Sequence, residues 1–321
     1  MPGNSDTAAI GRSNLILMIA AFGGLAGGVV FPGLAEPLAW VPKGGMLLFL
    51  FLCFIAIDPR ETWNGLRSAP GVILYLAVVK LLLLPVLLWG ALLLPLPEYA
   101  LVGVLLGGAP VGVIVPVLAI ILGVDFTLAL VGVAVTTLLL PLTLPPLAQL
   151  ASVYGADIGG VALDLPFGEM TLSLAVTIFI PLVAAQLLRR QAPALVARIG
   201  TWRSRISTVA VCLTGLAVFS RYSDLLLRDL SLLLTSVGVA VGLAFAIFGL
   251  GFFLTRRFPP AKRVAFIMSC TGMNNVLMLI LSAEFFGVRE ALVCAFYQLP
   301  FFGFLVLYRA LFRSLAGREE A

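Results

Sequence analysis

Long apolar runs constrain the fold of this chain more than any other feature of its sequence. A helix that spans a bilayer uses about 20 predominantly apolar residues. Ten such runs follow one another, at approximately residues 14–31, 38–57, 70–94, 98–122, 126–150, 170–188, 204–222, 231–255, 263–286 and 290–312. Of the 321 residues, 61% are hydrophobic and 11% are charged, whereas ordinary soluble domains are about 25% charged. The sequence therefore predicts an all-α polytopic membrane protein with ten transmembrane helices, and it excludes a soluble enzyme.

The first two runs are less regular than the others. The second contains Pro42 and Lys43, which shorten its uninterrupted apolar stretch, so we expect that helix to start late or to tilt. The first follows Arg12 in the manner of a signal peptide, but it has no evident small-residue cleavage site. We expect it to remain in the mature protein.

Positive charges alternate between the two sides of these ten runs. Lys and Arg are retained in cytoplasmic loops. One side carries four cations, Lys43, Arg221, Arg228 and Arg289, and Lys80 falls within a run. The other side carries Arg12, Arg60, Arg67, Arg189, Arg190, Arg198, Arg203, Arg205, Arg256, Arg257, Lys262, Arg263, Arg309, Arg313 and Arg318. This distribution predicts a cell-membrane protein with both termini in the cytoplasm. It also accounts for the net charge of +5 without a nucleic-acid partner.

Five spans in each half would make the two halves enter the membrane from opposite sides. Inverted repeats of this kind are typical of secondary transporters, which bind substrates where interrupted helices meet. The fourth run is interrupted at 107–112 and by Pro116, and the ninth by the polar stretch 269–275. These two runs are equivalent in a five-plus-five repeat. Because lipid cannot satisfy broken backbone, both interruptions must line a cavity or be buried in protein.

Lys80 is the one cation deep inside an apolar run. It lies about ten residues from the nearer end, or about 15 Å along a helix, which is too far for its side chain to reach the interface. Asp58, Asp125 and Glu284 all lie at the ends of runs, so no carboxylate is expected at its depth. Backbone carbonyls, helix C-terminal ends or a bound anion could serve as its partner, or it could lose its proton and be neutral. Its head could also simply face a water-filled crevice. An intramembrane cation is a functional candidate by default.

Several of these stretches together resemble the bile acid:sodium symporter family, within the bile/arsenite/riboflavin-type transporter superfamily. The resemblance covers about half of the chain, and auxin-efflux-type carriers share the architecture. It rests on the segment from Pro110 through Asp125 to Pro141 and Pro145, on the Lys80 to Pro85 spacing, and on Thr271-Gly272-Met273-Asn274-Asn275. It implies two inverted five-helix repeats in which discontinuous helices 4 and 9 cross at mid-membrane. It also implies a panel of helices 1–2 and 6–7 (residues 1–69 and 151–222) and a core of helices 3–5 and 8–10 (residues 70–150 and 223–321).

The chain departs from this family at the positions that bind sodium there. Cys270 stands where the family has Glu, and Asn274 where it has Gln. Lys80 replaces a Gln of the third helix. Val115 and Pro116 replace a Ser-Asn pair, and Ala129 and Val133 replace hydroxyl residues. Sodium needs several hard oxygen ligands, so the resemblance implies that almost all of them are missing here.

These departures suggest a sodium-independent carrier. We hypothesise that Lys80 either replaces the bound cation permanently or exchanges a proton during the cycle. The predicted ion-replacement residues are Lys80, Cys270, Thr271, Asn274 and Asn275, and the predicted substrate-lining residues are Pro110, Gly112, Pro116, Thr136, Ser269 and Met273. Half-helix N-termini and a lysine without an opposing carboxylate favour a small organic anion as substrate.

Three alternatives remain at this point. One is an uncoupled facilitator or channel of the same fold, and another is a sodium-coupled symporter that uses a residual site. An integral membrane enzyme is disfavoured, because the chain has no His and no paired carboxylates or activated nucleophile in its loops.

We predict no cofactor and no metal, and as partners only the anion, a proton and membrane lipid. Asp157, Asp164 and Glu169 make an outer loop acidic, which we interpret as a solvated surface.

Overall fold

The computed structural model describes residues 16, 19–156 and 167–317. Arg12, Asp157, Asp164, Arg318 and the start of the first apolar run lie outside these residues. The described part is all-helical, and its only extended pairing is an isolated antiparallel bridge between Val111 and Met273.

Several helices begin or end where the sequence supplies a boundary signal. Pro59, Pro70, Pro193 and Pro260 each occupy the first position of a helix, where the missing amide donor costs nothing. Gly123 ends another helix in the left-handed conformation, with φ of 68°. After the helix Ile19–Val30, the first half contains η1 (Pro32–Leu34), α2 (Val41–Ala56), α3 (Pro59–Ser68), α4 (Pro70–Val78), η2 (Val79–Leu83), α5 (Leu84–Leu93), η3 (Pro97–Tyr99), α6 (Ala100–Gly108), α7 (Ile114–Leu122) and α8 (Phe126–Ala156). The second half contains α9 (Phe167–Gln191), α10 (Pro193–Ser220), α11 (Ser223–Arg228), α12 (Leu230–Leu254), α13 (Pro260–Thr271), α14 (Asn275–Phe285), α15 (Val288–Phe296) and α16 (Gln298–Ala316).

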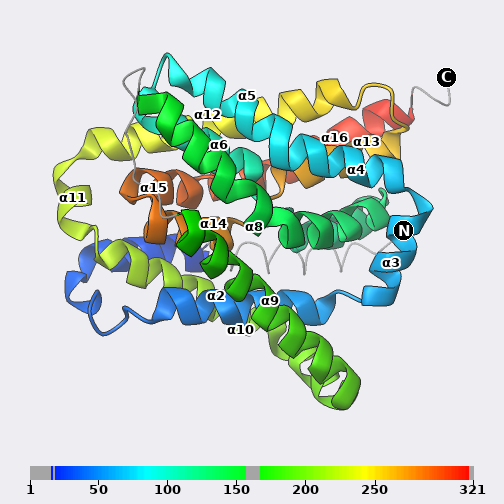
Figure 1. Cartoon of the computed structure of the whole chain (residues 1–321), viewed down its shortest axis with the longest axis horizontal. Coiled ribbons are helices and arrows are strands. Elements are labelled where there is room, and N and C mark those ends of the chain that lie inside the picture. Colours follow the sequence, from blue (N-terminus) through cyan, green and yellow to red (C-terminus); the bar gives the residue numbers. More distant parts are fainter. Residues whose placement is uncertain (1–15, 17–18, 157–166, 318–321) are drawn as a thin grey trace.

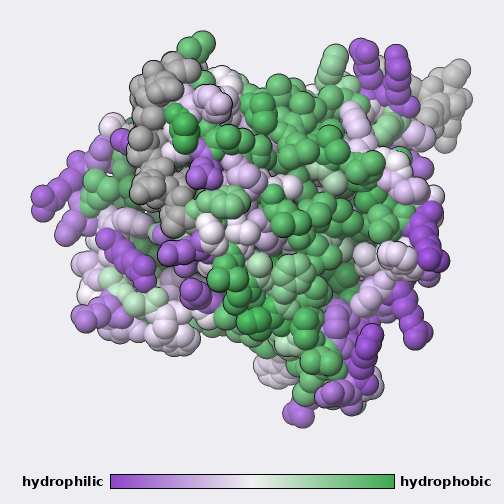
Figure 2. All heavy atoms as spheres, viewed as in Figure 1, coloured by the Kyte–Doolittle hydropathy of each residue, from purple (hydrophilic) through white to green (hydrophobic). Residues whose placement is uncertain are grey.

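Four helices in the described part are long and apolar enough to cross a membrane by themselves. They are Pro70–Leu93, Phe126–Tyr154, Phe167–Gln191 and Leu230–Leu254. The bent pairs Val41–Ala56 with Pro59–Ser68 and Val288–Phe301 with Gly303–Ala316 raise the number to six if each pair is one span. The remaining predicted spans are short or broken, so ten crossings stay a prediction. Apolar side chains cover the middle of the face in Figure 2, and hydrophilic side chains gather toward its two ends.

Helices α2 and α10 lie along one side of the molecule, away from α4, α5 and α12 (Figure 1). α2 packs against both α9 and α10. Arg189, in the last turn of α9, donates to the carbonyl oxygens of Ile55 and Ile57 at 3.0 and 2.9 Å and pairs with Asp58 at 2.9 Å. Asp58 also caps α3, because it accepts the amide of Arg60 at 2.8 Å. Arg189 and Asp58 thus tie the end of α9 to the junction between α2 and α3.

The long helix that carries Lys80 contains one wide turn. Residues Val79–Leu83 form the π-helical segment η2 between α4 and α5. Pro85 follows two residues later; it has no amide to donate, and its ring would clash with the carbonyl four residues earlier in a regular helix. The amide of Leu84 instead bonds to the carbonyl of Val79, five residues back. Such single wide turns occur frequently at functional sites.

Candidate functional site

Two interrupted helices meet in the interior of the protein. α6 ends at Gly108 and α7 begins at Ile114, while α13 ends at Thr271 and α14 begins at Asn275. The extended stretches between them pair with each other: the amide of Gly112 donates to the carbonyl of Gly272 at 2.7 Å, and that of Asn274 donates to Pro110 at 2.9 Å. Each break thus supplies hydrogen bonds that lipid could not provide.

Side chains fix the geometry of this crossing. Gly112 allows the two backbones to approach, because a Cβ at that position would lie 2.7 Å from the carbonyl oxygen of Met273. The Thr136 hydroxyl, on α8, accepts the amide of Val111 at 2.9 Å and donates to the carbonyl of Gly132 at 2.6 Å. Asn274 caps α14, since its side-chain oxygen accepts the amide of Leu277 at 3.3 Å. Thr136 and Asn274 therefore have structural roles at the crossing.

Lys80 lies at the carbonyl ends of both broken helices. It is fully buried, and its Nζ donates to the carbonyl oxygen of Cys270 at 2.8 Å and to that of Leu106 at 3.4 Å. Both carbonyls belong to the last turn of their helix, where backbone oxygens have no intrahelical partner and the helix dipole is negative. Within the described residues, no carboxylate forms an ion pair with Lys80. The sequence left several possible partners for Lys80, and the structure shows that backbone carbonyls at helix C-terminal ends are its partners.

A close contact between α5 and α6 brings the Leu106 carbonyl within reach of Lys80. Gly103 and Gly107 form a small-residue stripe of the GxxxG type. A Cβ on Gly107 would lie 2.5 Å from the Pro85 nitrogen, and one on Gly103 would lie 2.6 Å from the Leu88 carbonyl carbon. The two backbones therefore touch along the stripe.

A cavity of about 100 Å³ opens beside the crossing, on the side where the second half-helices begin. The N-terminal ends of α7 and α14 border it, and these ends carry partial positive charge. α2 and α10 contribute Phe49 and Val211 to the opposite wall. Its lining residues are Phe49, Gly112, Val113, Ile114, Val211, Met273, Asn274, Asn275, Val276, Gln298 and Phe301.

Four predicted site residues line this cavity, namely Gly112, Met273, Asn274 and Asn275. The side-chain oxygen of Asn275 is buried without a hydrogen-bond partner among the described residues. Such an acceptor is costly to leave unsatisfied, and it is therefore available to a ligand.

The other predicted site residues are not part of the lining. The Ser269 hydroxyl donates to the carbonyl of Ala265, and that of Thr271 donates to the carbonyl of Ile267 and bonds with the Tyr308 hydroxyl. Tyr297 donates to the carbonyl of Thr271 at 2.9 Å. These contacts hold the end of α13 in place. The complete set outside the lining is Lys80, Pro110, Pro116, Thr136, Ser269, Cys270 and Thr271.

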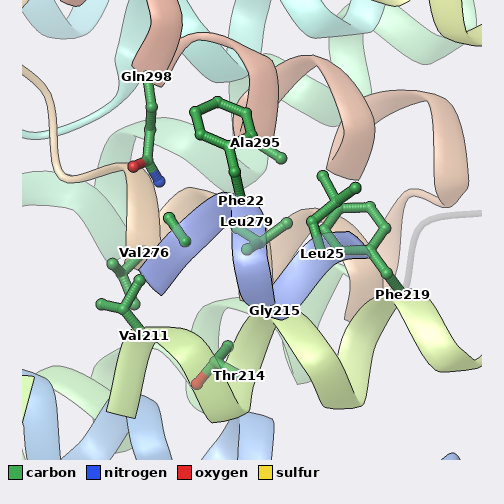
Figure 3. A pocket seen from close by; sticks show the side chains of 11 residues that line it. Phe22, Leu25, Val211, Thr214, Gly215, Phe219, Val276, Leu279, Ala295 and Gln298 are labelled. Atoms are coloured by element: carbon green, nitrogen blue, oxygen red, sulfur yellow. The ribbon is translucent and has the colours of Figure 1, made fainter. Parts of the chain in front are cut away.

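Sequence reasoning missed Gln298 and Glu290. Gln298 lines the cavity and a smaller adjoining one of about 20 Å³, and Figure 3 shows its side chain extending toward Val276 and Val211. A lone amide within the apolar run 290–312 was the available signal. Glu290, near the start of α15, is only 6% exposed although it stands at the end of a predicted span. It does not line the cavity.

The described residues contain no group of three or more His, Cys, Asp or Glu that could hold a metal ion. At the crossing, two backbone carbonyl oxygens that could act as ligands of a cation already accept hydrogen bonds from the Lys80 ammonium.

Comparison with known proteins identifies the chain at the family level. No curated protein matches it. The model of the Sodium Bile acid symporter family matches residues 45–229, which is 185 of the 321 residues. The match includes Lys80 and the α6–α7 break but ends before α13. The resemblance inferred from the sequence is confirmed, and the chain belongs to the Sodium Bile acid symporter family, a family of multi-pass membrane transporters.

Proposed function

We propose that this protein is a secondary transporter that moves a small organic anion by alternating access without sodium. Membership of the family supports transport of an organic substrate, and the family name describes transport that is linked to sodium. The observation that supports sodium independence is the position of the Lys80 ammonium between the carbonyls of Leu106 and Cys270. A cation fixed by covalent attachment satisfies the same carbonyl ends that a bound ion would satisfy. Sodium is then not needed to hold the crossing together.

The cavity supports an anion as substrate. Two half-helix N-termini face it, and no carboxylate is among its described lining residues. Asn275 and Gln298 offer neutral hydrogen bonds, while Phe49, Val211 and Phe301 offer apolar contact. A volume of about 100 Å³ suits a small molecule in this conformation.

Ten crossings in two inverted repeats complete the proposal. The packing of α2 with α9 and α10 supports a panel, and the pairing of the two breaks supports a core that contains α4–α8 and α12–α16. The cavity lies between these two groups, so a movement of one against the other would open it to alternate sides. Both termini would then face the cytoplasm.

Uptake into proteoliposomes tests the function. A radiolabelled keto acid, pantothenate and a bile acid are suitable probes. We expect saturable uptake of at least one of them at equal rates in sodium and potassium buffers, and faster uptake when the vesicles are preloaded with the same compound. Such counterflow distinguishes a carrier from a channel. Uptake that requires a sodium gradient would contradict the proposal.

A comparison at different proton gradients separates the two roles of Lys80. If the ammonium is a permanent replacement, an imposed proton gradient leaves accumulation unchanged. If Lys80 exchanges a proton, accumulation by the unmodified chain follows the gradient.

A further inference from the structure

A second cleft lies at the end of the molecule that the charge pattern places on the cytoplasmic side. It has a volume of about 520 Å³, and it separates the start of α4 from the end of α12. The hydroxyl of Tyr75 donates to the carbonyl of Leu254 at 3.2 Å and so links its two walls. The lining consists of Gly71, Val72, Tyr75, Phe253, Leu254, Arg256, Arg257 and Phe258.

Arg256 and Arg257 are the charged residues among the described residues of this lining. Neither forms an ion pair with another described residue. The guanidinium of Arg256 lies 4.9 Å from the ring centroid of Phe253, and the side chain of Arg257 is exposed. Guanidinium groups match the geometry of phosphate oxygens. The cleft therefore has an unneutralised positive end suited to a phosphate.

The other walls are mostly apolar, and they range from half-buried to exposed. Phe253 is 61% exposed, and Val72 and Phe258 continue the same surface. A soluble phosphate would gain nothing from these walls, whereas an acyl chain would cover them. Basic pockets between membrane helices on the cytoplasmic side are suited to anionic headgroups. The combination of charge and apolar surface favours a lipid over a soluble anion.

Two aromatic residues of the cleft lining, Tyr75 and Phe258, pack against Phe266 of α13, which itself does not line the cleft. The ring of Tyr75 on α4 lies 5.4 Å from that of Phe266 on α13 and 5.9 Å from that of Phe258. Tyr75 precedes Lys80 by five residues, and Phe266 precedes Cys270 by four. An occupant of the cleft would contact Tyr75 and Phe258 directly, and through their rings it would restrain Phe266 and hence α13.

We propose that this cleft binds one anionic phospholipid, with its phosphate at Arg256 and Arg257 and an acyl chain along Val72 and Phe253, and that the bound lipid stabilises the pairing of α4 with α13. This lipid site is separate from the transport cavity, because the two share no lining residue.

Thermal unfolding of the purified full chain in detergent tests the site without any transported substrate. Phosphatidylglycerol and phosphatidylcholine with identical acyl chains are added at equal mole fractions, and glycerol 3-phosphate is added separately. We expect phosphatidylglycerol to raise Tm by about 2 °C or more relative to phosphatidylcholine. No difference between the lipids, or an equal rise with glycerol 3-phosphate alone, would overturn the proposal.

Two kinds of variant locate the effect. R256Q/R257Q should lose most of the phosphatidylglycerol shift, whereas R190Q/R198Q, which removes two exposed arginines from the same predicted side, should keep it. Gly71→Leu places a side chain where a Cβ meets no atom within 4 Å, so it would fill the cleft while both arginines remain. It should also lose the shift, and it carries the test if the arginine variant does not fold. A full shift in both cleft variants would refute the site.

Discussion

Lys80 combines complete burial with hydrogen bonds to backbone carbonyls only. A charged side chain inside a membrane protein needs compensation, and here two helix C-terminal ends supply it. The two breaks also separate helix ends of opposite partial charge. The carbonyl ends of α6 and α13 face the ammonium, and the amide ends of α7 and α14 face the cavity. In the proposed transporter, Lys80 would therefore act on the substrate through the crossing rather than by contact.

Replacement of Lys80 by Met should abolish most transport. The two carbonyls lose their donor, and a buried unsatisfied group costs about 1–3 kcal/mol. We expect a drop of at least about tenfold in the initial uptake rate, corresponding to about 1.4 kcal/mol, and a lower Tm. Ser282→Ala removes another buried polar side chain away from the crossing and serves as the control. An unchanged rate in Lys80→Met would exclude a role for the lysine.

Asn275→Leu should weaken substrate binding without lowering the thermal stability of the protein. The side-chain oxygen of Asn275 has no partner among the described residues, so its removal eliminates an unsatisfied buried acceptor. We expect Tm to stay equal or to rise, while KM for uptake rises by about tenfold or more because the substrate loses a hydrogen bond. Kinetics of uptake at several substrate concentrations measure this. A lower Tm with unchanged KM would assign Asn275 a structural role.

At the scale of helices, the close packing of α5 against α6 requires glycine in the contact. Gly107→Ala would place a Cβ 2.5 Å from the Pro85 nitrogen, so α6 must shift away and carry the Leu106 carbonyl with it. We expect a lower Tm and slower uptake. Gly90→Ala on α5 is the matched control, since a Cβ there meets nothing within 4 Å. It should be neutral or slightly stabilising, because Ala favours the helix by up to about 1 kcal/mol. Equal Tm values for the two variants would contradict the packing argument.

Local signals in the sequence were sufficient to predict the two breaks. Consecutive glycines with Pro110 interrupt α6–α7, and the polar stretch 269–275 interrupts α13–α14. Helix ends were less predictable. The apolar run 204–222 corresponds to α10, which begins at Pro193, because hydrophobicity reports the membrane-embedded length whereas a helix can continue into polar surroundings.

The partners of the site residues could not be predicted from local patterns. The choice of Cys270 and Leu106 as acceptors for Lys80 depends on the wide turn η2 and on the contact at Gly107. Ser269 and Thr271 are polar residues in a membrane run, and the sequence could not reveal that they satisfy carbonyls of their own helix. Gln298 enters the cavity only because α15 folds back beside α14 and α16, which Gln298 begins, packs against α13.

At the scale of the whole molecule, we expect coupling to an ion to depend on the net charge buried at the crossing. In this chain that charge is one ammonium. K80Q/C270E would restore the two residue types that the family resemblance assigns to these positions, and it would replace a buried cation by a buried carboxylate. A carboxylate there faces carbonyl oxygens and needs a cation. Sodium in the buffer should then stabilise the fold.

Tm in sodium chloride and in potassium chloride measures this conversion. We expect equal values for the unmodified chain and a Tm that is higher in sodium by about 2 °C or more for K80Q/C270E. Cys270→Glu alone is the matched control, because Lys80 remains to pair with the introduced carboxylate and no ion is needed. The missing hydroxyls at Ala129 and Val133 should keep sodium affinity modest. If the double variant responds equally to both salts, or the unmodified chain already prefers sodium, then Lys80 does not stand in for the ion.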